Sequence, residues 1–418
     1  MLFVFLYFVL LFIAPQLWIE PFVGMPVDFF LYPAWIGWIA MTGRAKDLLR
    51  LSTQDLFFAA WLVWIVASIA INGFEENSSS VIQDYVKWFI LYRLLVVSLP
   101  TLPQVRRVSL MLLFFSLILA VEGIQQMHSP TGTGWAGQGF SWVDVEAARE
   151  GVHGRTRWIN IFDGPGVFCV VYTIALPFAA QYLVKPFGAG TRVRGILLLA
   201  PLLLATFYTG SRGGFLATVG VFGLFMLTKV RISPGRMALI GGVLLAVLAL
   251  APSYLTSTSD AEGSAQHRID MWAEGIEMVR YQPVFGIGRG NYLRYTNRLI
   301  AHNSAIEIMG ETGFPGLFLW LGIIYMGFKN LLAAYREIED PVSRSFVLAL
   351  GLSVAGYIMS SMFVTLEYET FYLLLGLTAA VGNTLTTPPK FTRSDFWKMG
   401  AIIAVFFVVV KAVVMLYV

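Results

Sequence analysis

The sequence contains little of what a soluble protein is made of. Only 13% of its 418 residues are charged, whereas 57% are hydrophobic. These proportions exclude an ordinary soluble protein and are typical of a membrane protein that crosses the bilayer many times. Cysteine is almost absent, and because Cys169 is the single one, neither an intrachain disulfide nor a cysteine-based metal site can form.

Long apolar runs are what the sequence does have. A membrane-spanning helix needs about 20 mostly apolar residues, and about thirteen stretches of the chain meet that description. The predicted spans are residues 1–18, 27–43, 54–72, 82–99, 107–123, 162–184, 195–209, 213–229, 237–254, 314–330, 345–362, 368–386 and 399–417. We therefore predict an all-α polytopic membrane helix bundle of about 12–13 spans, folded as a single integral membrane domain over residues 1–418.

Charge divides the loops between these spans into two kinds. The short loops near residues 19–26, 73–81 and 363–367 contain neither lysine nor arginine, whereas the loops that alternate with them carry several. Cytoplasmic loops are enriched in both residues. The loops without them are therefore predicted to face away from the cytoplasm, and two long segments, 124–161 and 255–313, fall on that same outer side.

The basic residues predicted on the outer side are all arginines. Arginine presents a planar fork that binds phosphate oxygens in a bidentate manner and stays charged at any pH. Pairing with carboxylates of the outer side or with lipid headgroups is the alternative interpretation for any one of them. As a set they predict a site for a multiply anionic ligand. They are Arg149, Arg155, Arg157, Arg212, Arg268, Arg280, Arg289, Arg294 and Arg298.

The outer segment 255–313 is predicted to be partly helical. Within Gln266–Arg280, apolar residues recur at helical spacing, which predicts an amphipathic helix on or near the outer surface. Arg268 and Trp272 lie one turn apart, so they can stack on one face, although a plain surface helix would carry the same pair. Pro283 ends this helix.

A second, polar helix is predicted to begin at His302 and Asn303. Asn303, Glu307 and Glu311 line one face of it at i, i+4 and i+8. Carboxylates at a membrane edge are costly unless paired, so Glu307 or Glu311 is expected to hold an arginine or to orient His302. The glycines and proline of Gly313–Gly316 should break the helix, which is tolerated where backbone borders a water-filled cavity.

The segment Gly210-Ser211-Arg212-Gly213-Gly214 lies where one predicted span ends outside and the next begins. Glycines allow a backbone to approach a ligand closely, and the N–H groups at a helix start favour an anion. The alternative is a tight turn between helices with Arg212 extended toward the membrane surface. The segment alone does not decide between them.

Three signals thus follow one another on the predicted outer face. They are Gly-Ser-Arg-Gly-Gly at 210–214, Arg-x-x-x-Trp at 268–272 with Pro-x-x-Gly-x-Gly at 283–288, and His-Asn at 302–303 with Glu-x-Gly-x-x-Gly at 311–316. In that order they resemble the O-antigen ligase and O-antigen polymerase superfamily of bacterial envelope glycan enzymes. Elsewhere the chain agrees with the superfamily in hydropathy, and the predicted span 399–417 is one more than the usual twelve.

The resemblance implies a GT-C-like, metal-independent glycosyltransferase without a cofactor, in the bacterial inner membrane and with its site facing the periplasm. Its donor would be a glycan linked through pyrophosphate to undecaprenol, its acceptor a glycan or glycolipid, and its surroundings membrane lipid, with no nucleic acid. Arg212 and Arg268 would bind the pyrophosphate, and His302 would be the general base or would orient the acceptor. Further substrate-binding candidates are Arg289, Asn303, Glu311, Trp272, Arg155 and Arg157.

Elementary chemistry leads to the same groups. Breaking a sugar–pyrophosphate bond builds negative charge on the leaving oxygens, which preorganised arginines stabilise. A sugar hydroxyl is a poor nucleophile, so a histidine within hydrogen-bond reach would help as a base. The sequence offers no dense Asp-x-Asp metal site, and Asp144-Val145-Glu146 is its nearest approach.

Other functions remain open at this point. Ligase and polymerase are not separated by these motifs, although the single dominant outer loop favours a ligase. A lipid-glycan flippase or exporter would also need arginines for phosphate, but it would not need His302, and many transporters show an internal repeat that is not visible here. A scaffold for an envelope assembly complex would tolerate substitution of the outer motifs.

Overall fold

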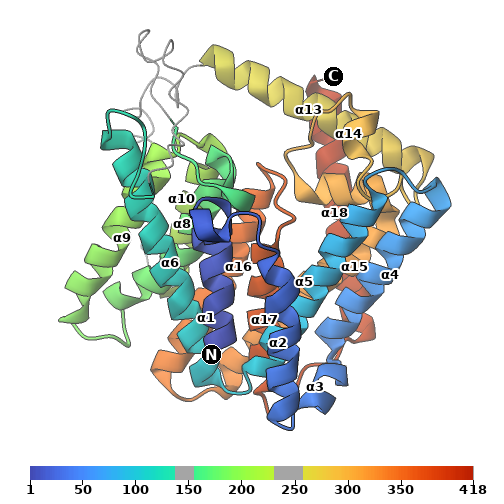
Figure 1. Cartoon of the computed structure of the whole chain (residues 1–418). Helices are drawn as coiled ribbons and strands as arrows, with labels where there is room; N and C mark the ends of the chain where they lie inside the picture. Colours follow the sequence, from blue (N-terminus) through green and yellow to red (C-terminus); the bar gives the residue numbers. More distant parts are fainter. Residues whose placement is uncertain (137–154, 230–257, 418) are drawn as a thin grey trace. The chain divides into compact units, whose positions relative to one another are not determined.

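Helices form the regular structure of the protein in the computed structural model, which describes residues 1–136, 155–229 and 258–417 (Figure 1). No β-strand occurs in those three ranges. Within them, seven helices are long and apolar enough to cross a bilayer, and Leu2–Ile13, Phe29–Met41 and Arg212–Thr228 are shorter apolar helices. The predicted fold class, an all-α polytopic membrane bundle, is confirmed.

Packing divides the chain into two compact units, each assembled from three stretches of sequence. Unit 1 consists of Met1–Trp35, Pro103–Thr258 and Ile338–Phe363. Its helices are α1 (Leu2–Phe8), the first part of α2 (Val27–Met41), α6 (Leu102–His128), α8 (Pro165–Ala180), α9 (Thr191–Tyr208), α10 (Arg212–Lys229) and α16 (Pro341–Ser361), with short turns at Val9–Ile13, Pro15–Leu17, Glu20–Phe22, Asn160–Phe162 and Gln181–Leu183. At its centre lies α8, whose Val167–Ala180 stretch is buried and which contacts α9, α10 and α16.

Unit 2 consists of Ile36–Leu102, Ser259–Glu337 and Val364–Val418. Its helices are α3 (Ala45–Leu49), α4 (Thr53–Asn72), α5 (Ser78–Ser98), α13 (Thr258–Tyr281), α14 (Tyr292–Tyr295), α15 (Ser304–Glu337), α17 (Glu369–Asn383) and α18 (Arg393–Tyr417). The long helix α15 packs against α4, α17 and α18, and α5 packs against α17 and α4. Unit 2 contains most of the predicted site residues, including Arg268, Arg289 and His302.

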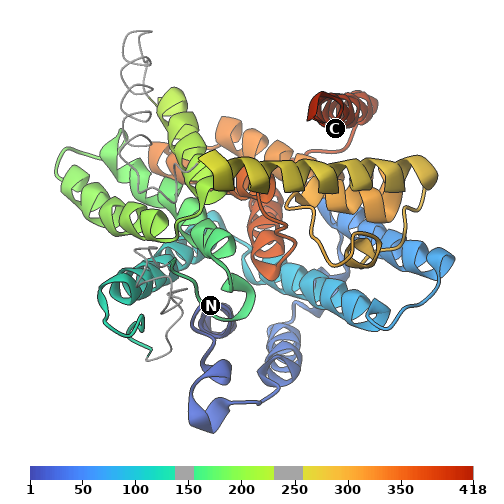
Figure 2. The ribbon, with the colours of Figure 1, turned by 90° about the horizontal axis from the view of Figure 1, so that it is seen from above.

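The helix α13 includes the predicted amphipathic helix Gln266–Arg280 and extends it toward the N-terminus. Figure 2 shows α13 from the side while α18 is seen end-on, so the two run crosswise. Ile276 and Met278 of α13 are buried in one apolar cluster, to which Val410 of α18 also belongs. By length and composition α18 is a candidate membrane span, and a helix crosswise to it would lie along the membrane surface; that location of α13 stays a prediction.

The predicted break in α15 is a kink. Gly313 has φ 71° and ψ −175° inside an otherwise helical run. The carbonyl groups of the turn before it bond elsewhere: Gly310 accepts from the N–H of Ile287 at 3.1 Å and Glu311 from that of Gly288 at 3.0 Å. The N–H of Phe314 donates to Pro283 at 2.9 Å. The loop 283–288 thus replaces the hydrogen bonds that the kink removes, which is how a broken helix stays stable in a membrane.

Two glycines make this junction between the loop and α15 possible. At Gly286, which has φ 61°, a Cβ atom would lie 2.3 Å from the backbone carbonyl carbon of Glu311. At Gly313, a Cβ would lie 2.2 Å from the carbonyl oxygen of Val284. Side chains at either position would collide with backbone that has no room to move. The motif Pro-x-x-Gly-x-Gly and the motif Glu-x-Gly-x-x-Gly are therefore two halves of one junction.

The predicted spans within the described ranges overlap helices, which differ from them in extent. The span predicted at 314–330 follows the kink at Gly313 and lies in the second of the two helical segments that make up the 34 residues of α15. The predicted span 237–254, Arg149 and Asp144-Val145-Glu146 lie outside the described residues. That residues 1–418 form a single domain stays a prediction.

Candidate functional site

His302 lies directly before α15, in a left-handed backbone conformation with φ 50°. Its Nδ1 atom is buried and has no hydrogen-bond partner among the described residues. Burial, and after it the nearby positive charges of Arg268 and His267, together lower the pKa of His302 to about 4. The imidazole is therefore neutral at physiological pH and can accept a proton.

Arg268 belongs to α13, so the two residues most prominent in the sequence motifs come from different elements of unit 2. Arg268 lies near enough to His302 for its positive charge to act on the imidazole. The structure therefore brings this predicted cation and this predicted base together. It does so through tertiary packing, because 34 positions of sequence separate them.

Trp272 and Asn303 hold the backbone on both sides of His302. The indole N–H of Trp272 donates to the carbonyl oxygen of Ala301 at 3.0 Å. The side-chain oxygen of Asn303 accepts from the N–H groups of Ala305 and Ile306 at 3.1 and 3.3 Å, as a helix N-cap does. Both residues, predicted to bind substrate, are thus observed supporting His302.

An apolar cluster lies beneath this region. It joins α13, α14, the start of α15 and α18 through Ile276, Met278, Ile287, Tyr292, Ala301, Ile306 and Val410, with Trp272, Phe406, Phe407 and Val414 packed against it. The fully buried Ala301 precedes His302 directly. The unusual backbone at His302 is therefore held by packing as well as by hydrogen bonds.

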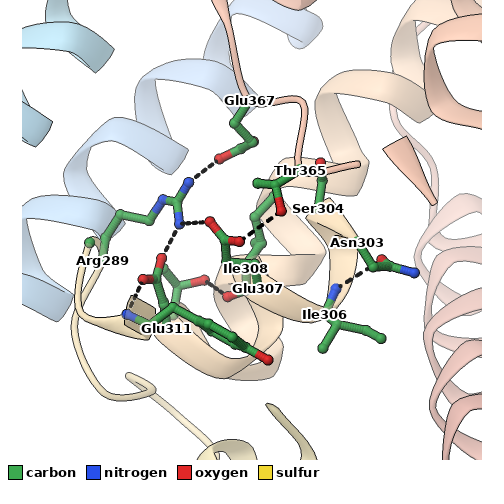
Figure 3. A network of polar contacts seen from close by, with 12 residues as sticks. Arg289, Asn303, Ser304, Ile306, Glu307, Ile308, Glu311, Thr365 and Glu367 are labelled. Atoms are coloured by element: carbon green, nitrogen blue, oxygen red, sulfur yellow. Dashed lines mark hydrogen bonds and ion pairs between the residues drawn. The ribbon is translucent and has the colours of Figure 1, made fainter. Parts of the chain in front are cut away.

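Arg289 is surrounded by carboxylates (Figure 3). Its guanidinium forms ion pairs with Glu311, with Glu367 at 2.7 Å and with Glu307 at 3.5 Å. Its Nε donates to the Tyr85 hydroxyl at 2.9 Å, and that hydroxyl donates to Glu367. The prediction that Glu307 or Glu311 holds an arginine is confirmed, and both do.

This environment is different from the one expected for Arg289. A substrate-binding arginine directs its N–H donors at the ligand, whereas three glutamates of this protein occupy the donors of Arg289. The side chain of Arg289 is 9% exposed. A buried cation among three carboxylates connects the elements that supply them, so the contacts of Arg289 are those of a residue that positions its neighbours.

The loop before α17 closes the network around Arg289 (Figure 3). Thr365 donates to Glu307 at 2.9 Å, and the N–H of Leu366 donates to the hydroxyl of Ser304 at 2.8 Å. Glu311 also accepts from the N–H of Tyr292 at 2.6 Å. These bonds fix α14 and the loop 364–368 onto the first turns of α15, next to His302.

A small cavity opens beside Arg289. It encloses about 170 Å³, and its walls combine aromatic with acidic side chains. The lining residues are Val81, Asp84, Tyr85, Trp88, Arg289, Gly290, Tyr292, Leu293, Glu307 and Glu311. Aromatic faces and carboxylate oxygens are groups that can contact the apolar faces and the hydroxyls of a sugar ring.

Arg212 is the first residue of α10 and belongs to unit 1. The turn before it is capped by Ser211, whose hydroxyl accepts from the N–H of Gly214 at 3.1 Å. A Cβ at Gly214 would lie 2.4 Å from the sulfur of Cys169, so this glycine serves the contact between α10 and α8. The segment forms a tight turn between α9 and α10, and the role of Arg212 in binding an anion stays a prediction.

Arg155 and Arg157 also belong to unit 1. Arg157 pairs with Asp163 at 3.0 Å, and its carbonyl accepts from the side chain of Gln126 at 2.9 Å. Arg155 is exposed. Substrate binding by these two arginines stays a prediction.

The sequence did not single out Glu367, Thr365 or Tyr85 as site residues. Glu367 and Thr365 lie in a short loop that contains no basic residue, and nothing local distinguishes them. A partial signal existed for Tyr85, because it shares a predicted span with Asp84 and Lys87, and polar groups in a span predict an inward face. Asp84 and Lys87 form an ion pair at 4.0 Å.

Comparison with protein families finds that residues 197–321 match a family described as O-antigen ligase. The matched stretch contains Arg212, all of α13 and α14, and the first half of α15 with its kink. It therefore includes all three motifs that carried the resemblance. No curated protein matches the chain.

Proposed function

We propose that this chain, which belongs to the O-antigen ligase superfamily by its residues 197–321, transfers a glycan from undecaprenyl pyrophosphate to an acceptor hydroxyl. The superfamily has ligase or polymerase activity on lipid-linked glycans, and seven long apolar helices among the described residues make the protein a multi-pass membrane protein. We infer further that it lies in the bacterial inner membrane with its site facing the periplasm, because the loops on the other side carry the lysines.

The pair formed by His302 and Arg268 is the observation on which the proposal rests. A neutral imidazole with an unused ring nitrogen lies beside a guanidinium, at the junction of a surface helix with a membrane helix. The imidazole can take a proton, and the guanidinium can face an anionic leaving group. Transfer from a diphosphate carrier needs one group of each kind.

The proposed step is a single displacement at the anomeric carbon. The acceptor oxygen forms a bond to that carbon, the bond from the carbon to the pyrophosphate oxygen breaks, and the configuration inverts. His302 takes the hydroxyl proton, and the lipid pyrophosphate leaves with the electron pair. Arg268 stabilises the charge that grows on the leaving oxygens, with each charge-assisted hydrogen bond contributing about 1.5–3 kcal/mol.

Binding of the donor should also improve the base. Burial, and after it the positive charge of Arg268, hold the pKa of His302 low. A diphosphate paired with Arg268 compensates that charge, so the pKa of His302 rises when the donor is bound. The base would thus gain proton affinity at the stage of the cycle where it is needed.

Arg289 and the glutamates around it are proposed to position this pair. Glu311 connects Arg289 to α14, and Glu307 connects it to the loop 364–368. Trp272 and Asn303 fix the backbone on either side of His302. Arg212 is proposed as a second arginine for the pyrophosphate on the strength of its motif.

The test is transfer by the purified full-length protein in vesicles, with a defined undecaprenyl-pyrophosphate glycan and a radiolabelled or fluorescent acceptor. His302→Ala, Arg268→Ala and Arg212→Ala should each lower the rate by about a hundredfold or more. Arg280→Ala is the matched control, because Arg280 lies on the same helix with an exposed side chain. Full activity of all three site variants, shown to be folded, would refute the assignment.

Two further measurements define the reaction. A chelator should leave the rate unchanged, and complete loss would indicate a metal enzyme. Glycans that accumulate on the carrier in a deletion strain separate the two related activities, because single repeats indicate a polymerase and full-length chains a ligase. Translocation without new glycosidic bonds would favour a flippase over both.

A further inference from the structure

A second and larger cavity lies at the other end of unit 2. It encloses about 540 Å³. Its walls come from the start of α4, the end of α5, the later part of α15 and the end of α17. The lining residues are Arg44, Asp47, Arg50, Leu51, Ser52, Thr53, Gln54, Arg93, Val96, Val97, Pro100, Met326, Asn330, Gly382, Asn383, Pro388, Pro389 and Lys390.

This cavity is far from the candidate site. Asn330, which lines it, and Ser304, which contacts the loop beside the site, are both on α15. The helix between them has a length of at most about 39 Å at about 1.5 Å per residue. The hydrocarbon core of a bilayer is about 30 Å thick, so a helix of this length can carry the two sites at opposite membrane faces.

Positive charge dominates the cavity. Four of its lining residues are cations, namely Arg44, Arg50, Arg93 and Lys390, and only Asp47 is an anion. Asp47 pairs with Arg44 at 3.1 Å and with Arg50 at 3.6 Å, and Arg93 pairs with Asp55 outside the cavity wall. Four cations thus share two carboxylates, which leaves an excess of positive charge for a ligand.

A buried arginine holds this arrangement in place. Arg93 is 5% exposed and forms an ion pair with the fully buried Asp55 at 2.6 Å. Its second terminal nitrogen donates to the carbonyl oxygens of Asp47, Leu48 and Arg50 at 2.8, 3.2 and 2.8 Å. The backbone that carries Arg44 and Arg50 is therefore fixed before any ligand arrives, which lowers the cost of binding.

Apolar surface continues from the rim of the cavity. Leu49 is 84% exposed and directly precedes Arg50, and Leu51, which lines the cavity, is 41% exposed. A soluble phosphate compound has no apolar part that would contact these exposed leucines. A phospholipid presents its phosphate next to acyl chains, and basic residues beside apolar ones suit both parts of it.

We propose that this cavity binds the phosphodiester headgroup of an anionic phospholipid. Arg50, Lys390 and Arg44 contact the phosphate, and the leucines beside them contact the upper acyl chain. The assignment to the inner leaflet follows from the proposed orientation of the enzyme, but binding itself is independent of transfer activity.

The test is native mass spectrometry of the purified full-length protein in detergent with dihexanoyl phosphatidylglycerol. Phosphatidylcholine of the same chain length and inorganic phosphate are the competitors. We expect phosphatidylglycerol to bind about tenfold more tightly than phosphatidylcholine, and Arg50→Glu combined with Lys390→Glu to remove that preference. Both side chains are exposed, so the variant should fold.

The control is Arg336→Glu combined with Lys398→Glu, which changes the net charge equally at exposed positions outside the cavity. It should keep the preference for phosphatidylglycerol. Equal binding of both lipids, equal loss in both variants, or displacement of the lipid by inorganic phosphate at the same concentration would overturn the proposal; the last result would identify a soluble anion as the ligand. Because no turnover is measured, failure here is distinct from failure of the proposed glycan transfer.

Discussion

The indole N–H of Trp272 donates a hydrogen bond to the carbonyl oxygen of Ala301, with 3.0 Å between the nitrogen and the oxygen. Trp272 lies one helical turn beyond Arg268 on α13, and Ala301 directly precedes His302. One hydrogen bond therefore connects the helix that carries the candidate cation to the backbone that carries the candidate base. Together with the apolar cluster beneath, it holds the distance between them.

We expect Trp272→Phe to weaken this connection while keeping most of the apolar contact. The carbonyl of the fully buried Ala301 loses its donor, which costs about 1–3 kcal/mol of folding stability. Transfer should slow by about tenfold, because the two groups lose their fixed separation. The measurements are thermal unfolding in detergent and initial transfer rates. Trp397→Phe, at a 63% exposed position on α18, should change neither.

The acid limb of the pH profile should report His302. Its pKa is lowered to about 4, so the neutral form that can act as a base persists below neutral pH. We expect kcat/KM to stay level from pH 8 to about pH 5 and to fall as pH drops through about 4. The acid limb of kcat should lie at higher pH, because a bound diphosphate raises this pKa.

A substitution at Arg268 tests the same assignment independently of the rate. Arg268→Gln removes a positive charge that lowers the pKa of His302, so the acid limb should move upward toward the ordinary value of about 6.5. Arg280→Gln should leave the limb in place. An unmoved limb in Arg268→Gln would show that the two residues are not neighbours in the working enzyme.

Charge balance around Arg289 predicts losses of stability of different size for two neutralising substitutions. Arg289→Gln leaves the carboxylates of Glu307, Glu311 and Glu367 without their cation, which should destabilise the protein by about 3–5 kcal/mol. Glu367→Gln removes one negative charge from a group that has three for one arginine, and it should cost less than about 1 kcal/mol. Thermal unfolding of the two variants, measured side by side, tests this difference. A similar loss of stability in both variants would mean that the excess of negative charge around Arg289 does not determine the stability of the network.

The junction at the kink predicts the effect of adding one methyl group. Gly286→Ala places Cβ 2.3 Å from backbone of Glu311 at a residue with φ 61°, so it should destabilise the protein by about 2–4 kcal/mol and lower expression. Gly400→Ala is the control, because a Cβ there meets nothing within 4 Å. That variant should be neutral or slightly stabilising, as expected in a helix. Thermal unfolding and size-exclusion profiles measure both.

Local patterns in the sequence predicted the helices of this protein well, because membrane spans and amphipathic faces depend on the types and spacing of neighbouring residues. The helix at Gln266–Arg280, the polar face through Glu307 and Glu311, and the break at Gly313 were all predicted and are all present. Each depends on composition or spacing within a few turns of helix.

Interactions between distant segments could not be predicted in the same way. The partner of Glu307 and Glu311 is Arg289. The sequence contains several outer arginines, and nothing in it distinguishes Arg289 as the partner. Glu367 meets Arg289 across 78 positions of sequence, in a loop with no distinguishing pattern. The glycines after Arg212 were open to two interpretations, and only the position of Cys169 against Gly214 shows which contact they serve.

The backbone junction between the loop 283–288 and the kink of α15 has a consequence for how such a protein can vary. Its hydrogen bonds join main-chain atoms, at Ile287 with Gly310 and at Gly288 with Glu311, so they depend on register and not on side-chain identity. Insertion or deletion of a single residue between Pro283 and Gly288 would shift every pair at once, whereas exchange of Val284 or Ile287 for another apolar residue would disturb none. Homologous chains are therefore expected to keep the length of this loop even where its amino-acid residues differ.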